Sequence, residues 1–592
     1  MESTLTYARC RAPLFLALGL LTLGCSSDDT ETTHDESSIA EDERATGDDN
    51  AAADDDEEGA LDPSRRYPAS GNVGTSAPGA ATKDAGAAAL GDDGASTPLP
   101  AAVDVASMTP PSVSSEPRPL PAPAVNPFVD ASKDPFSTFG ADVDTASYDR
   151  LRQSLQRQSL PAPSEVRVED YVNYFKYDYP VPAADAAQPF SIALAAAAHP
   201  TGRATTLLRV GIQAKAAPVA SDKPANVVFL VDVSGSMASA DKLPLVKRVL
   251  EEALKVLAPT DKVSIVTYAS DTRVRLGPTP VSSKELIEPV IRGLEAGGST
   301  NGGSGINLAY EQANAALVPG GINHVVLCTD GDFNLGITSN DALLALIREK
   351  RSTGITLTAL GVGSDHLNDT MMEKVSNAGN GSYSIVYSED QAVEYANERL
   401  LSTIVHVAKD MKIQVEFNPS SVLAYRLLGY EDRAIADASF RDDKVDGGEV
   451  GAEHRVTALY ELVLAGGQVP QPAGAPLLSP GESSMLVREL DPAELVRVKV
   501  RSKAVTASDA DAASEVSAAL TPASISATAD ADLAWAAAVA ATAEILRKSP
   551  YAALTELAAI EAIVAGQKER DADRTEFATL WTTLRTLVEQ PR

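Results

Sequence analysis

A short apolar run that ends in three oxygen-bearing side chains constrains this chain most strongly. Residues 227–231 read Val-Val-Phe-Leu-Val, which is typical of a central parallel strand covered by helices on both faces. Asp232, Ser234 and Ser236 follow at alternate positions, where a loop can turn a carboxylate and two hydroxyls toward one point. Such oxygens suit a hard divalent cation, Mg²⁺ first, with Mn²⁺ or Ca²⁺ as alternatives. The sequence therefore predicts a metal site at the end of a buried strand.

Two later stretches offer further oxygens for this site. Thr300 lies in the Gly-rich loop 297–301, after a predicted helix. Asp330 ends a second buried strand, predicted at 324–329. A D-x-S-x-S sequence, then a Thr in a Gly-rich loop, then an Asp after a second strand, resembles the metal-ion-dependent adhesion site of the von Willebrand factor type A domain.

The resemblance implies a role for each of these residues. The metal ligands through hydroxyls would be Ser234, Ser236 and Thr300, while Asp232 and Asp330 would bind the metal directly or through water. If neutral hydroxyls dominate, the ion keeps much of its positive charge and a vacant position, so a partner's Asp or Glu can complete its octahedron. We therefore expect the site to receive a carboxylate.

Simpler roles exist for the same residues. Ser234 and Ser236 could cap the following helix, and Asp330 could start a turn. For five residues in this order the metal site is the better interpretation. Asp332 resembles the pattern of the bacterial YfbK-type proteins, a subgroup of this family. We expect it to tune the metal from outside the ligand shell, or else to hold the turn.

The pattern of apolar segments predicts an α/β fold for residues 224–404. Strands alternate with helices, as a doubly wound, mainly parallel sheet of the type A (Rossmann-like) kind requires. The strands are predicted at 226–232, 262–268, 324–329, 355–361 and 382–387, and the helices at 241–257, 283–295, 305–317, 340–351, 367–377 and 389–403. The predicted metal residues all follow strands or lie in loops at one edge, where such sheets bind ligands.

Two flanking regions complete the folded part and resemble those of YfbK-type proteins. The N-terminal region, 127–223, contains predicted strands at 190–194 and 206–214, and the C-terminal β domain, 405–503, contains further ones. We expect the two sets to pair, so that the α/β domain is inserted in a β-sandwich. In the N-terminal region, Asp142 and Asp144 are interpreted as helix caps.

The end of the chain is predicted to be helical. Residues 504–526 are rich in Ala, Ser, Asp and Thr and are interpreted as a linker. Residues 527–592 follow as a helical unit, whose three apolar stripes are expected to pack on the β domain; recruitment of a partner is the alternative.

The start of the chain carries a targeting pattern. Residues 1–24 read as a signal peptide, with an apolar run that ends before Gly24-Cys25, and this pair resembles the bacterial lipobox. We therefore expect lipid on Cys25 and an anchor in the cell envelope, in the outer membrane, facing either the periplasm or the cell surface. Residues 25–126 are interpreted as a disordered acidic tether, because 26–126 contain 21 Asp or Glu against five Lys or Arg and few apolar side chains.

The composition and motifs favour binding over catalysis. A net charge of −32 argues against a nucleic-acid partner. The sequence contains neither a nucleotide-binding G-x-x-x-x-G-K-[ST] loop nor a G-x-S-x-G or H-E-x-x-H motif. We expect an adhesion or scaffolding protein that is not an enzyme and that binds a protein through its Asp or Glu. The alternatives are a metal-dependent hydrolase and a metal that only stabilises the fold.

Overall fold

The computed structural model describes most of the chain beyond residue 124. The described residues are 125–141, 143–183, 185–216, 224–299, 303–331, 340–363, 367–445, 447–482, 486–505, 507 and 511–590, and all belong to one compact unit, residues 112–592. The predictions for the signal peptide, Cys25, nearly all of the tether, Asp142, Thr300 and Asp332 lie outside the described residues.

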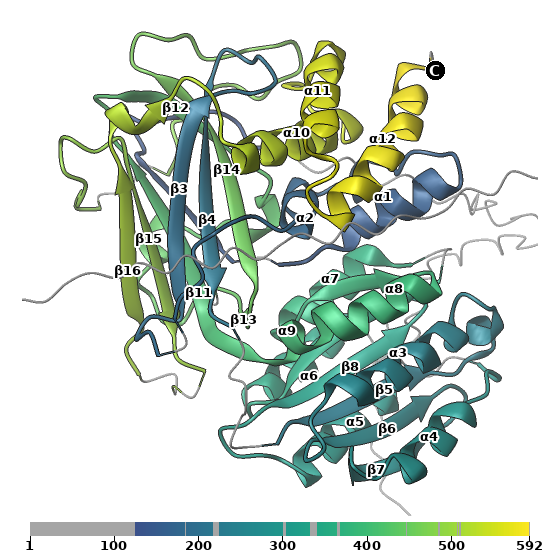
Figure 1. Cartoon of the computed structure of the whole chain (residues 1–592). Coiled ribbons are helices and arrows are strands. Elements are labelled where there is room, and N and C mark those ends of the chain that lie inside the picture. The colour runs from purple at the N-terminus through teal and green to yellow at the C-terminus, as the bar shows by residue number, and fades with distance from the viewer. Residues whose placement is uncertain are drawn as a thin grey trace, which may run out of the picture. The chain divides into compact units, whose positions relative to one another are not determined.

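The α/β domain is built on a six-stranded sheet with the predicted apolar run near its centre (Figure 1). Strand β5 (Asn226–Asp232) is buried along its whole length. It pairs in parallel with β6 (Lys262–Tyr268) and β8 (Asn323–Thr329). The sheet continues in parallel from β8 through β9 (Thr356–Val362) to β10 (Tyr383–Val386).

Helices cover both faces of this sheet, as the doubly wound prediction requires. Alternate residues of β5 point to opposite faces, so Val227 and Phe229 lie in one apolar cluster and Val228 and Leu230 in another. The first face is covered by α3 (Leu243–Val256), α4 (Lys284–Arg292), α8 (Glu389–Glu394) and α9 (Leu400–Ile404), and the second by α5 (Gly303–Ala315), α6 (Asn340–Arg351) and α7 (Asp369–Ala378).

One strand of this sheet was not predicted. Strand β7 (Thr272–Pro280) pairs antiparallel with β6 at the edge of the sheet. Arg273, Val274 and Arg275 in its first half are all exposed. An edge strand of this kind buries no alternating set of apolar side chains, so it lacks the period that marks a strand in sequence.

The flanking regions form a β-sandwich into which the α/β domain is inserted, as predicted. The decisive contact is the antiparallel pair of β4 (Thr206–Ala214) with β14 (Arg455–Leu464), which joins strands from either side of the inserted domain. The first sheet has the order β1 (Val129–Asp130), β12 (Val422–Leu428), β14, β4, β3 (Phe190–Ala198) and β17 (Ile525–Ser526). In the second sheet, β11 (His406–Phe417) pairs with β2 (Phe136–Gly140), β13 (Val450–Gly451) and β15 (Val496–Lys503), and β15 also pairs with β16 (Ser514–Leu520).

The interpretation of residues 504–526 as a linker was wrong. Strand β16 pairs along its whole length with β15, and β17 adds a short parallel pair to β3. The side chains of β16 are exposed or half-buried, so Ala, Ser and Glu suffice there. Because small and polar residues are enough for an exposed edge strand, its composition was mistaken for that of a linker.

The C-terminal helices pack against the sandwich and the N-terminal helices. Helix α10 (Ala531–Leu546) shares an apolar cluster with α1 (Ala146–Gln156), α2 (Val168–Tyr174) and residues of β4, β12 and β14. Helices α11 (Leu557–Gln567) and α12 (Ala572–Glu589) complete this layer (Figure 1). The expected packing on the β domain is thus confirmed. None of the helices in the described ranges has both the length and the apolar character that crossing a membrane requires.

The predicted capping role of Asp144 was also wrong. Helix α1 begins after Thr145, which makes no side-chain capping bond. The Asp144 carboxylate instead accepts a hydrogen bond from the backbone N–H of Tyr383 in β10, at 2.8 Å. Asp144 therefore connects the N-terminal region to the edge strand of the inserted domain.

Candidate metal site

The predicted metal residues lie where β5 and β8 end side by side. Val231 of β5 is paired with Cys328 of β8, so Asp232 and Asp330 both follow at the carboxyl edge of the sheet. Ligands of open α/β sheets bind at this edge. Cys328, one residue before Thr329, is buried and free.

Asp232 is fully buried and held by neutral donors. Its Oδ1 accepts a hydrogen bond from the backbone N–H of Ser234 at 2.8 Å, and its Oδ2 accepts one from the Thr329 hydroxyl at 3.1 Å. Burial raises the pKa of Asp232, although the bonds from Ser234 oppose this change and the nearby Asp330 charge adds to it. A nearby cation would relieve the cost of burying this charge.

Two hydroxyls extend the site from the interior to the surface. Ser234 is buried, Ser236 is exposed, and their Oγ atoms lie 3.0 Å apart. Ser234 immediately precedes the 3₁₀ turn Gly235–Ala238, and Ser236 lies within this turn. A ligand shared by these hydroxyls would therefore remain accessible to solvent on the Ser236 side.

The Gly-rich loop is bonded directly to the loop after β5. Gly297 donates its N–H to the carbonyl of Val233 at 2.8 Å, and Gly235 donates to the carbonyl of Gly298 at 3.0 Å. Gly298 has a φ of +84°, a conformation that favours glycine. Ser299 is described and Thr300 is not, so the structure brings the loop that carries Thr300 to the site without describing this side chain.

Asp330 meets a cation that sequence reasoning missed. Its side chain is buried, and its Oδ2 accepts a hydrogen bond from Nζ of Lys242 at 2.8 Å. Lys242 lies immediately before α3. A basic residue at the end of the loop that carries the D-x-S-x-S motif was the available signal, but nothing local indicated which carboxylate it would reach.

The described donor set fits a hard cation bound largely through hydroxyls. The structure brings together Asp232, Ser234, Ser236 and Asp330, two carboxylates and two hydroxyls. In the described part of the chain, no group of three or more His, Cys, Asp or Glu side chains is arranged to hold a metal ion. A metal at this edge of the sheet would thus need the serine hydroxyls, as Mg²⁺ or Ca²⁺ permits.

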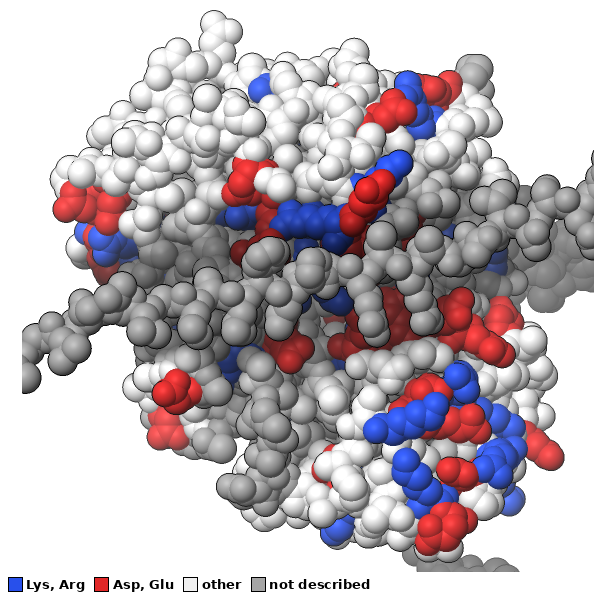
Figure 2. All heavy atoms as spheres, in the orientation of Figure 1, with Lys and Arg blue, Asp and Glu red and all other residues white. Residues whose placement is uncertain are grey.

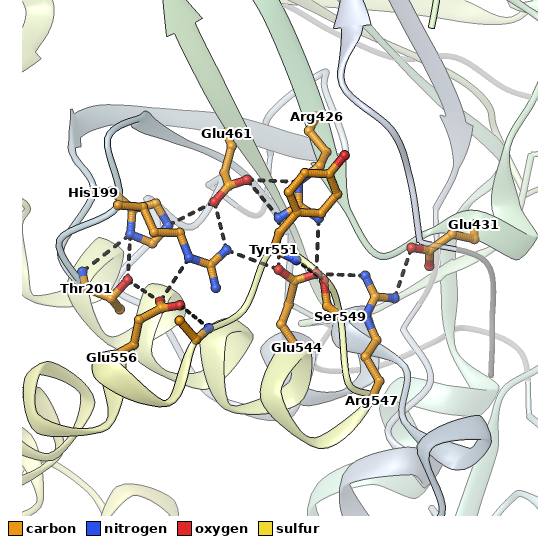
Figure 3. Close-up of polar contacts among 12 residues, drawn as sticks. His199, Thr201, Arg426, Glu431, Glu461, Glu544, Arg547, Ser549, Tyr551 and Glu556 are labelled. Carbon is orange, nitrogen blue, oxygen red and sulfur yellow. Dashed lines mark hydrogen bonds and ion pairs between the residues drawn. The ribbon is translucent and has the colours of Figure 1, made fainter. Parts of the chain in front are cut away.

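A second polar cluster, not predicted from the sequence, lies between the sandwich and α10 (Figure 3). Arg426 of β12 donates to Glu461 of β14 at 2.9 Å and to both oxygens of Glu544 of α10 at 3.1 and 2.9 Å. Arg203 also bonds both of these carboxylates, at 2.8 and 3.1 Å. The cluster extends to His199, Thr201, Glu431, Arg547 and Glu556. We call these nine residues the buried ion cluster.

Each glutamate of the buried ion cluster is paired with at least one arginine. Arg426 and Glu544 have fully buried side chains. Burial alone would raise the pKa of Glu544, but Arg426, Arg547 and Arg203 hold it well below its usual value. The ring of Tyr551 also lies 4.2 Å from the guanidinium of Arg426. This cluster is therefore built to fix α10 on the sheet rather than to receive a ligand.

Charge is mixed on the exposed face drawn in Figure 2. Over its lower part, where the α/β domain lies, Lys and Arg side chains alternate with Asp and Glu. The α/β domain carries surface ion pairs such as Arg273–Asp271 and Arg292–Glu288.

Comparisons with known families match three stretches of the chain. Residues 226–399 match the von Willebrand factor type A domain, residues 402–587 match the family described as uncharacterized protein YfbK, C-terminal, and residues 121–209 match a family described as von Willebrand factor. The inserted domain and the sequence that follows it therefore both agree with the resemblance inferred from the motifs.

Individual relatives agree with these matches. The uncharacterized protein YfbK of Escherichia coli K12 is 39% identical over 383 residues, which cover 64% of this chain and 66% of that protein. The human inter-alpha-trypsin inhibitor heavy chain H4 is 29% identical over 150 residues, 24% of this chain and 16% of that protein. The chain thus spans just under two thirds of the first relative and about a sixth of the second.

A solved structure titled von Willebrand factor type A from Catenulispora acidiphila is also similar. It is 18% identical, covers 70% of this chain and 89% of its own chain, and superposes with a TM-score of 0.38.

Proposed function

We propose, on the premise that the chain is a von Willebrand factor type A domain protein of the YfbK type, that it binds a protein partner through a metal ion. Type A domains mediate binding between proteins and commonly bind divalent metals. The observation that carries the proposal is the hydroxyl pair of Ser234 and Ser236, with Oγ atoms 3.0 Å apart and the second residue exposed.

The chemistry of the donors supports a partner carboxylate as the ligand. Mg²⁺ would be held by Asp232, Ser234, Ser236 and Asp330, together with Thr300. The metal supplies a strong positive charge at the protein surface. Because hydroxyl ligands are neutral, they leave more of that charge available to an incoming Asp or Glu than an all-carboxylate site would. The protein is then a binding module and not an enzyme.

The place of action is proposed from the N-terminal sequence. A lipid on Cys25 would anchor the protein in the bacterial cell envelope, and the acidic tether of residues 25–126 would hold the folded part away from the membrane. In this arrangement the metal site serves adhesion or scaffolding at the envelope. A Cys25→Ala variant should fail to incorporate a fatty-acid label that the wild type incorporates.

The proposal is tested by capture of a partner from envelope extract with the full chain. The wild type is compared in millimolar Mg²⁺ and in chelator, and with Ser236→Ala, which removes one proposed ligand at the surface. Ser239→Ala is the matched control, since Ser239 is an exposed serine three residues away whose hydroxyl bonds Asp241.

The expected result is a protein retained by the wild type and by Ser239→Ala in Mg²⁺, and lost in chelator and with Ser236→Ala. An identical bound set in all samples would overturn metal-bridged recognition. If chelator lowered the melting temperature but left the bound set unchanged, the metal would be a structural element only.

A further inference from the structure

The Lys242 side chain, which is paired with Asp330, has a defined position beside the metal site. The Lys242 side chain is mostly buried, with an exposed fraction of 16%, and its Nζ lies 2.8 Å from Oδ2 of Asp330. Its aliphatic part passes over Gly363, which directly follows β9. A Cβ added to Gly363 would lie 2.8 Å from Cγ and 2.9 Å from Cε of Lys242. A side chain at Gly363 would therefore displace the lysine from this position, and the φ of +98° at Gly363 also favours glycine.

A helix of the N-terminal region fixes the position of Gly363, on which the Lys242 side chain packs. The carbonyl of Gly363 accepts a hydrogen bond from Nε2 of Gln153 in α1 at 3.0 Å. Gln153 is buried, and its Oε1 accepts a bond from Arg150 at 2.6 Å. Arg150 in turn binds the Asp369 carboxylate at the start of α7 with distances of 3.1 and 2.8 Å. Helix α1 thus positions the backbone on which Lys242 rests.

The same helix also contacts the C-terminal unit. Arg152 of α1 donates to Glu576 of α12 at 2.9 Å, and Tyr148 packs in the apolar cluster with Phe577. A continuous series of contacts therefore leads from the C-terminal helices through α1, Gln153 and Gly363 to Lys242 and Asp330.

We propose that Lys242 is a built-in counter-ion that competes with the metal for Asp330, and that α1 sets the strength of this competition through Gln153 and Gly363. The inference rests on the proposed metal-binding function and concerns its regulation. Without metal, the ammonium group neutralises a buried carboxylate that lies close to Asp232. A divalent cation that binds the same carboxylate meets a repelling charge until Lys242 moves away.

Two substitutions test the charge of Lys242 and the contact of α1 with Gly363 separately. Lys242→Met keeps the length and apolar character of the side chain and removes its charge. Lys247→Met is the matched control, a half-buried lysine on α3 that bonds the Arg292 carbonyl. Gln153→Leu removes the bond to Gly363, and Gln156→Leu, an exposed glutamine on the same helix, is its control.

The measurement is calorimetric titration of the full chain with Mg²⁺ and with Mn²⁺, without any partner. Lys242→Met should bind both metals about tenfold more tightly than the wild type, because a like charge beside the ion is gone. In chelator the same variant should melt at a lower temperature, because the Asp330 carboxylate loses its counter-ion. Gln153→Leu should also tighten metal binding, by a smaller factor, and this effect should vanish when it is combined with Lys242→Met. Both controls should behave as the wild type.

The failures of the two proposals are distinguishable. Equal or weaker metal affinity in Lys242→Met, with metal bound by the wild type, would overturn the counter-ion role and leave the proposed function standing. An effect of Gln153→Leu that persists in the double variant would overturn the route through α1. If neither the wild type nor Lys242→Met bound a metal, the proposed function and this inference would both fall.

Discussion

Asp232 at the end of β5 and the glutamates of the buried ion cluster are held in opposite ways. In the cluster, Glu544 and Glu461 are both contacted by Arg426 and Arg203, so their charges are cancelled inside the protein. In the loops, Asp232 accepts hydrogen bonds from an amide and a hydroxyl, which leave its negative charge in place. The comparison shows how neutral donors can keep a buried carboxylate available to a cation.

Exposure differs between the two regions as well. The side chains of Arg426 and Glu544 are fully buried, whereas the loop site reaches the surface at Ser236. We make four predictions that test this contrast between a closed cluster and an open site, in order from the largest to the smallest expected effect on stability.

Removing the central arginine of the buried ion cluster should lower the free energy of unfolding more than any other change considered. Arg426→Met leaves Glu544 and Glu461 buried with only part of their compensation, so the free energy of unfolding should fall by about 3–5 kcal/mol. Urea unfolding of the full chain measures this change. The control is Arg441→Met, which also removes an arginine paired with two glutamates, Glu489 and Glu515, but at the surface. Similar losses in both variants would show that burial of the cluster contributes nothing special.

Acid should weaken the ion cluster through His199. Burial lowers the pKa of His199 to about 4 despite the nearby Glu461 charge, against about 6.5 in an unfolded chain. The unfolded state therefore binds the proton first as pH falls. Stability from this group is complete above about pH 6.5 and is lost progressively down to about pH 4.

The substitution His199→Gln tests whether protonation of His199 lowers the stability as the pH falls. Between pH 6.5 and 5, His199 should lower the free energy of unfolding by about 2 kcal/mol, and His199→Gln should remove this part of the pH dependence. Urea unfolding at several pH values gives the slope for both proteins. The remaining slope comes from other buried groups and should be the same in both proteins: His324, His406 and His454, whose pKa values are also lowered, and Asp149 and Asp437, whose pKa values are raised and act in the opposite direction. Equal slopes in the two proteins would contradict the prediction.

Metal should stabilise the open site by a smaller amount. A free Mg²⁺ concentration ten times the Kd adds about 1.4 kcal/mol to the free energy of unfolding, provided that the unfolded chain does not bind the ion. Differential scanning calorimetry in Mg²⁺ and in chelator measures the gain. Asp232→Asn should lose this gain, whereas Asp271→Asn, an exposed aspartate in the loop after β6, should keep it.

The smallest effect on folding is expected at the surface end of the site. Ser236 is exposed, so Ser236→Ala in chelator should change the free energy of unfolding by less than about 0.5 kcal/mol. The same substitution should abolish the stabilisation by Mg²⁺. A large loss of stability in chelator would instead show that Ser236 stabilises the fold without metal. The metal site would then differ less from the buried ion cluster.

Local patterns in the sequence were sufficient for the main architecture. The apolar run of β5 and the D-x-S-x-S motif after it depend on neighbouring residues in the chain, and the structure places Asp232, Ser234 and Ser236 in contact as expected. The insertion of the α/β domain in a sandwich also followed from strand periods on both sides of it, and the β4–β14 pair confirms it. Thr300 and Asp332 stay predictions.

Long-range contacts and exposed edges could be found only in the folded chain. Lys242 reaches Asp330 across 88 positions, and Arg426 reaches Glu544 across 118, so no short window of sequence contains either pair. Strands β7 and β16 lie at sheet edges and bury few side chains, which removes the alternating pattern that reveals a strand. Hydrophobic burial acts on every residue of a segment and leaves a periodic trace in sequence, whereas a charge pair depends on which distant elements the fold brings together.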